Sequence, residues 1–207
     1  MKRFLLLCGV AAPIVYLCTV IYGGVITPGY SHIAHAISEL VAEGAPLRWR
    51  IDPGFILYNQ LMFCFCAGLF VAFRERGPRI VGLMIAGIAI ASDLMYWFAM
   101  DPRGAAPTLA GNVHWALATI ISLLTIAATL GGWFFFRGVP GLDSLRPYAL
   151  ATGLVLLVSG PVTVAAAVTQ SSLFGLIERV TIGGYIQFVF VIALRASTRY
   201  LPRRAAV

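Results

Sequence analysis

The sequence contains very few charged residues for its length. Asp, Glu, Lys and Arg make up 11% of its 207 residues, whereas hydrophobic residues make up 60%, and the mean hydropathy is +0.89. Soluble domains carry about 25% charged residues, so a soluble globular protein is excluded. Intrinsic disorder is excluded as well, because a chain this apolar has ample surface to bury.

Motifs of several enzyme and transporter classes are also missing. The four cysteines lie inside apolar stretches without a Cys-x-x-Cys spacing, and no His-Glu-x-x-His zinc sequence occurs. No internal repeat is visible, which disfavours a transporter built from inverted repeats. The formal net charge is +7, but no nucleic-acid-binding module accompanies it, so nucleic acid is not an expected partner.

Long apolar stretches predict an all-α fold, a bundle of six transmembrane helices that forms a single domain over residues 1–207. One span needs about 20 apolar residues. Pro53 and Pro147 stand at two predicted helix starts, where the missing amide costs no hydrogen bond. The predicted helices cover residues 4–26, 53–73, 80–100, 112–136, 147–169 and 178–200.

Basic residues are distributed unequally between the two ends of these helices. Of the 15 Lys and Arg residues, eleven fall on the side of the chain termini and four on the other. The positive-inside rule therefore predicts both termini in the cytoplasm, as for a protein of the bacterial inner membrane. The four basic residues on the outer side are Arg48, Arg50, Arg103 and Arg179.

Acidic residues and histidines gather toward the predicted outer side, which suggests a site at the outer membrane face. The first outer loop contains a predicted amphipathic helix over residues 32–43, ended by Gly44. This helix either lies on the bilayer surface or folds its polar face over the mouth of the bundle. That polar face consists of His32, His35, Glu39 and Glu43.

Asp93 and Arg179 are charged residues within predicted spans, and both require partners. Asp93 is about two turns below the outer end of the third helix, so it is expected to face the interior and contact Asn59 or Gln60. Arg179 begins the last helix. It is predicted either to pair with Asp101 or Glu39, or to hold a phosphate or carboxylate headgroup.

Short motifs occur in a fixed order along nearly the whole chain. They are Pro28-Gly29-Tyr30-Ser31, Ile37-Ser38-Glu39-Leu40, Gly44-Ala45-Pro46, Asp101-Pro102, His114 and Glu178-Arg179. Together they resemble a broad bacterial family of six-helix membrane proteins that carry a domain of unknown function. That family is distantly similar to the Frag, DRAM and Sfk membrane proteins, some of which are linked to lipid-anchor remodelling. The resemblance implies functional positions at Ser38, Glu39, Asp101, His114 and Arg179.

A candidate catalytic group follows from the chemistry of these side chains. His114 is the predicted general base or a metal ligand, and Asp101 and Glu39 would orient it or activate water. Arg179, Ser38 and Asp93 are the predicted substrate contacts, with Arg179 holding an oxyanion or headgroup. His32, His35 and His114 are candidate ligands for a divalent metal such as zinc. The resemblance leaves His32 and His35 outside its pattern.

Two functional hypotheses remain open. In the first, an outward-facing polar pocket binds or processes a lipid or other amphiphile, by hydrolysis or acyl transfer if it is an enzyme. In the second, the polar cluster is a non-catalytic clasp between helices that supports assembly or partner binding. Membrane lipids are the expected partners in the first case, and a homo-oligomer is compatible with either.

Overall fold

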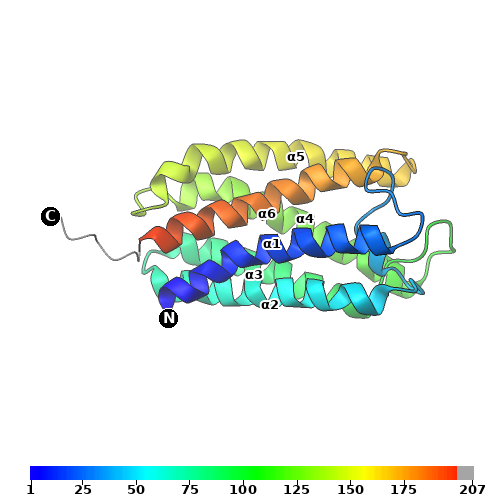
Figure 1. Ribbon diagram of the computed structural model, residues 1–207. Coiled ribbons are helices and arrows are strands. Elements are labelled where there is room, and N and C mark those ends of the chain that lie inside the picture. The colour runs from blue at the N-terminus through cyan, green and yellow to red at the C-terminus, as the bar shows by residue number, and fades with distance from the viewer. Residues whose placement is uncertain (200–207) are drawn as a thin grey trace.

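Six long helices lie side by side within residues 1–199, which the computed structural model describes (Figure 1). Each is long and apolar enough to cross a membrane, so the predicted all-α transmembrane bundle is confirmed over these residues. Two short 3-10 helices lie in the loops, η1 (Ser38–Val41) and η2 (Asp143–Leu145). The long helices are α1 (Lys2–Ile26), α2 (Arg48–Ala72), α3 (Arg76–Trp97), α4 (Leu109–Phe135), α5 (Arg146–Val168) and α6 (Phe174–Thr198).

The long helices form a closed ring. Each packs against the next along the chain, and α6 returns to pack against α1. Phe65, Leu69 and Phe188 are almost completely buried between them. On the outside, large apolar side chains such as Leu123 and Val158 are exposed, which costs little in a bilayer whose tails are as apolar as leucine. The protein is therefore a multi-pass membrane protein.

The N-terminus and the end of α6 lie at one end of the bundle (Figure 1). The loops α1–α2, α3–α4 and α5–α6 lie at the other end, which we call the loop end. Arg203, Arg204 and the predicted last residue of the sixth helix, Tyr200, lie outside the described residues.

Some predicted helix starts are corrected by the structure. Pro53 lies inside α2, which begins earlier at Arg48, whereas Pro147 is in the first turn of α5 as predicted. The first turn of α2 is polar, so hydropathy did not detect it. It is stabilised by an ion pair between Arg48 Nε and Asp52 Oδ2 at 2.8 Å, since residues four apart face each other on a helix.

The amphipathic helix predicted over residues 32–43 is largely absent. Only Ser38–Val41 is helical, as η1. A regular helix would join the Ile33 carbonyl to the Ile37 amide. Instead the Ile33 carbonyl accepts from Leu176 N at 2.9 Å, and Ile37 N donates to Glu178 Oε2 at 2.7 Å. Hydrogen bonds to α6 thus replace those of the predicted helix.

The first outer loop packs onto the loop end of the bundle through its apolar residues. Ala36, Ile37 and Leu40 are buried, with at most 6% of each exposed. On the other side of η1, Glu43 N donates to the Met100 carbonyl at 2.9 Å. Gly44 has a φ of 73°, a conformation that favours glycine, and it turns the chain back toward α2.

Candidate functional site

Arg179 is the centre of a hydrogen-bond network between α6 and the first outer loop. Its Nη1 donates to the His35 carbonyl at 3.0 Å, and its Nη2 donates to the Tyr30 hydroxyl at 2.6 Å. Nη2 also contacts His32 Nδ1 at 3.1 Å. Since arginine only donates hydrogen bonds, this histidine nitrogen is the acceptor. The guanidinium thereby holds three residues of the loop against α6.

Tyr30 continues the network from Arg179 into the loop backbone. Its hydroxyl accepts from Arg179 and donates to the Ala36 carbonyl at 2.9 Å. Burial raises the pKa of Tyr30 to about 12, so the hydroxyl keeps its proton and remains a donor at neutral pH. The predicted ion pair of Arg179 with Asp101 or Glu39 is wrong, because both carboxylates have other partners.

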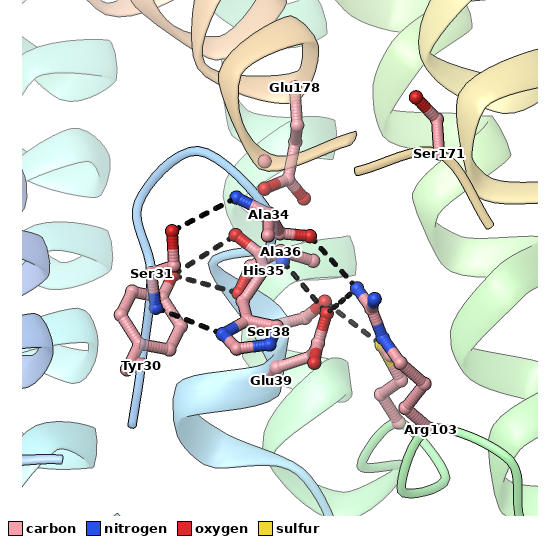
Figure 2. A network of polar contacts seen from close by, with 12 residues as sticks. Tyr30, Ser31, Ala34, His35, Ala36, Ser38, Glu39, Arg103, Ser171 and Glu178 are labelled. Carbon is pink, nitrogen blue, oxygen red and sulfur yellow. Dashed lines mark hydrogen bonds and ion pairs between the residues drawn. The ribbon is translucent and has the colours of Figure 1, made fainter. Parts of the chain in front are cut away.

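Glu178 binds the same loop from the adjacent position of α6. Its carboxylate accepts from Ile37 N and points toward the loop in Figure 2. The close approach of the loop is possible because position 175 is glycine. A Cβ at Gly175 would stand 2.3 Å from the His35 carbonyl oxygen, far inside van der Waals contact.

Glu39 joins the loop to the α3–α4 connection. Its Oε1 accepts from Ala36 N at 2.9 Å and from Arg103 Nη2 at 2.7 Å, as Figure 2 shows. Arg103 Nη2 also donates to the Ala34 carbonyl at 3.0 Å. The Glu39 side chain is 15% exposed and that of Arg103 38%, so this ion pair lies at the edge of the protein.

Asp101 lies in the α3–α4 connection and is bound by the residue that caps α4. Its two oxygens accept from the amide and the hydroxyl of Thr108, at 2.9 and 2.7 Å. Thr108 in turn caps α4, because its hydroxyl accepts from Gly111 N at 3.1 Å. The hydrogen bonds from Thr108 lower the pKa of Asp101, so this carboxylate is ionised at neutral pH.

The remaining predicted residues lie apart from Arg179. His114 is buried on α4 with 7% exposed, and its Nδ1 donates to the Phe98 carbonyl at 3.0 Å, since a carbonyl oxygen only accepts. Ser38 Oγ contacts Met100 Sδ at 3.1 Å. Asp93 accepts from Asn59 Nδ2 at 2.7 Å, which confirms the predicted partner on the second helix.

In the structure, each of the predicted catalytic residues has different hydrogen-bond partners. In the described chain, no hydrogen bond or ion pair joins His114, Asp101 and Glu39 to one another. Asp101 and His114 are close enough to influence each other electrostatically, but each is oriented by a different group. The arrangement therefore lacks a base held by an acid, as a catalytic triad requires.

A metal centre is not assembled either. Within residues 1–199, no three His, Cys, Asp or Glu side chains gather closely enough to hold an ion. Two of the candidate histidines use Nδ1 as an acceptor inside the loop network: His32 accepts from Arg179, and His35 accepts from Ser31 N at 2.9 Å. The third, His114, is on α4 beneath the α3–α4 connection.

A cavity of about 230 Å³ lies beside the Glu39–Arg103 ion pair. It is bounded by the first outer loop, the α3–α4 connection, the start of α4 and the α5–α6 connection. Its polar lining comprises Glu39, Asp101, Arg103, Asn112 and Gln170, and its larger apolar side chains are Met100, Trp115 and Phe174. Two predicted catalytic residues, Glu39 and Asp101, thus line one cavity, whereas His114 and Arg179 do not line it.

A second cavity, of about 310 Å³, lies between α1 and α2. It is lined mostly by apolar side chains, with Arg50 and Thr19 among the polar exceptions, and it contains none of the predicted site residues. We therefore place the candidate site at the smaller cavity, where charged and aromatic side chains face the same space.

Over residues 10–195 the chain matches the model of a family described as "Protein of unknown function (DUF998)". The chain belongs to the DUF998 family. This confirms the predicted membership in a family with a domain of unknown function. No curated protein and no solved structure matches the chain.

The motifs on which the family resemblance was based largely coincide with the contacts that hold the first outer loop. Arg179 donates a hydrogen bond to the Tyr30 hydroxyl, and Ile37 N donates one to the Glu178 carboxylate. Sequence reasoning did not assign a role to Tyr30, although it lies in a quoted motif. It also missed Arg103, whose role depends on a contact with Glu39, 64 positions away in the chain.

Lowering the pH is expected to weaken the loop network through His32. Burial and the neighbouring Arg179 guanidinium lower the pKa of His32 below its usual 6.5. At this side chain the unfolded chain therefore binds more protons than the folded protein near pH 6, so the contribution of His32 to the free energy of unfolding falls as the pH drops from about 7.5 to about 5. The hydrogen bonds from Thr108 lower the pKa of Asp101, so Asp101 does not titrate in this range.

The variant His32→Asn is the control, because its amide oxygen accepts from Arg179 but does not titrate. We expect the free energy of unfolding of the original protein, measured relative to that of this variant, to fall over the same pH range, as determined by unfolding in detergent micelles. An identical pH dependence in both proteins would contradict the assignment to His32.

Proposed function

We propose that this DUF998 protein binds a membrane amphiphile in the cavity beside Glu39 and Arg103. The observation that carries the proposal is the mixed lining of this cavity, where charged groups and the Trp115 and Phe174 rings face one space. Ligand sites combine an apolar lining with a few polar groups in this way.

The position of the cavity supports an amphiphile in particular. Trp49, Trp97 and Trp115 are all partly or largely exposed at the loop end, at 68%, 75% and 46%. Exposed tryptophans concentrate at the level of the lipid headgroups. A ligand in the cavity would therefore have its polar part among the charged side chains and its chain toward the bilayer.

The orientation in the membrane is part of the same proposal. The excess of Lys and Arg at the end of the bundle that carries the N-terminus supports a cytoplasmic location of that end under the positive-inside rule. The cavity would then face the outside of a bacterial cytoplasmic membrane, and the first outer loop would cover it.

The hydrogen bonds between α6 and the first outer loop independently support a structural role for Arg179 and Glu178. The Arg179 and Glu178 side chains bind the backbone and side chains of the first outer loop, as expected of a clasp. We propose that this clasp keeps the loop in place as one wall of the cavity. Hydrolysis or acyl transfer has less support, because His114, Asp101 and Glu39 have separate partners.

Filling the cavity is expected to remove lipid binding. Ala167 lines the cavity on α5, and Ala167→Trp would occupy much of the space. With an equimolar mixture of dioleoyl phosphatidylethanolamine and dioleoyl phosphatidylglycerol as the probe, we expect the affinity to fall about tenfold, or about 1.4 kcal/mol. Native mass spectrometry of the purified protein measures the lipid-bound fraction.

Ala165→Trp is the matched control, because Ala165 is exposed on the same helix and lies outside the cavity lining. Thermal unfolding in detergent establishes that both variants fold. Equal lipid affinity in the two folded variants would rule out the cavity as the binding site.

A further inference from the structure

The charges that line the cavity do not balance. Glu39 and Arg103 form an ion pair at 2.7 Å and largely neutralise each other. Asp101 lines the same cavity, and the hydrogen bonds that hold its carboxylate come from the uncharged Thr108. The lining residues therefore carry one unbalanced negative charge, on Asp101. A cationic group entering the cavity would gain electrostatic energy there, and an anionic group would lose it.

An aromatic side chain faces the same space. Trp115 lines the cavity and is 46% exposed, so its ring is accessible to a ligand. It lies on α4, two turns after the Thr108 cap that holds Asp101. The face of an indole ring attracts ammonium groups, and tryptophan is the strongest of the aromatic residues in this respect. A carboxylate and an indole in one cavity thus favour the same type of ligand.

We propose that the polar head of the amphiphile carries an ammonium group that binds between Asp101 and Trp115. This inference rests on the proposed function and specifies its ligand class, an amine-bearing lipid. When that head also carries a phosphate, Arg103, two residues after Asp101 in the α3–α4 connection, is the cation that lines the cavity. The neutral Asn112 is on the same face of α4 as Trp115, three residues before it.

The test compares two lipids with the same dioleoyl chains, phosphatidylethanolamine and phosphatidylglycerol. Each is titrated separately against the purified protein in detergent, and the bound fraction is measured by native mass spectrometry. We expect a preference of about fivefold for phosphatidylethanolamine, the size typical of one partly exposed charge interaction. Equal binding, or a preference for phosphatidylglycerol, would overturn the inference.

Two variants with opposite expected effects test whether the preference for phosphatidylethanolamine arises in the cavity. Asp101→Asn removes the unbalanced charge and is expected to abolish the preference, whereas Asn112→Asp adds a carboxylate to the lining and is expected to increase it. Asp143→Asn is the control, because Asp143 is an acid at the other end of the bundle, 54% exposed. If Asp101→Asn does not fold, the Asn112→Asp result alone decides: an unchanged preference would contradict the inference.

The outcomes separate this inference from the proposed function. Lipid binding that is lost in Ala167→Trp but shows no preference for the amine leaves the proposed function standing and overturns the ammonium site. Binding that is insensitive to Ala167→Trp overturns both. Glycerophosphoethanolamine, which has the same head without acyl chains, is tested as a competitor. Competition as strong as that of the lipid would assign the site to a soluble amine and contradict the amphiphile.

Discussion

Replacing Arg179 with glutamine is expected to lower the free energy of unfolding by about 3 kcal/mol, because two partly buried acceptors lose their donor at once. The Tyr30 hydroxyl and the His35 carbonyl both accept from the guanidinium. The neighbouring Glu178 carboxylate, whose acceptor bond is to the Ile37 amide, would also lose its adjacent cation. A glutamine side chain has one amide group and cannot reach all of these partners.

Arg50→Gln is the matched control for this prediction. Arg50 is exposed at the same end of the bundle, and its guanidinium lies over the Trp49 ring at 4.8 Å. Its replacement is expected to change the stability by no more than about 0.5 kcal/mol. Reversible unfolding in mixed micelles measures both variants. Similar stabilities for the two would show that the Arg179 network does not hold the loop.

Gly175→Ala is expected to have the second largest effect, about 2 kcal/mol or more of lost stability. The added Cβ would stand 2.3 Å from the His35 carbonyl oxygen and 2.9 Å from that of His32. Both are backbone atoms, so the loop itself must move away from α6. That movement would also break the hydrogen bond that Leu176 N donates to the Ile33 carbonyl.

The control for the glycine prediction lies on the same helix. A Cβ at Gly183 would meet nothing within 4 Å, so Gly183→Ala is expected to be neutral or to stabilise α6 by up to about 1 kcal/mol through helix propensity. The same unfolding measurement applies to both variants. A Gly175→Ala protein as stable as Gly183→Ala would contradict the close packing of the loop on α6.

The helices could be predicted because their physical cause is local. A stretch of about 20 apolar residues must cross the bilayer as a helix, since lipid offers its backbone no other hydrogen-bond partner. Helix starts were predicted less well. The polar first turn of α2, with its Arg48–Asp52 ion pair, lies outside the apolar stretch by which the span was recognised.

The first outer loop shows why local patterns were insufficient for the site. Its sequence has helical periodicity, but the periodic pattern contains no information about competing partners. In the structure, Ile37 N binds Glu178 rather than continuing a helix, and Glu39 binds Ala36 N and Arg103 rather than exposing its carboxylate as part of a polar stripe. Partners from α6 and the α3–α4 connection decide the loop conformation.

The sequence by itself determined that this chain is a helical membrane protein, which end of its bundle carries the excess of basic residues, and which end carries the polar residues. Each of these properties follows from composition along the chain and from the low solubility of charge in lipid. Only the tertiary structure decided that Arg179 binds Tyr30 instead of an acid, and that Asp101 and Trp115 face a common cavity. The physical reason is that such contacts join residues far apart in the sequence, where many pairings satisfy the same hydrogen-bonding groups and only packing selects among them.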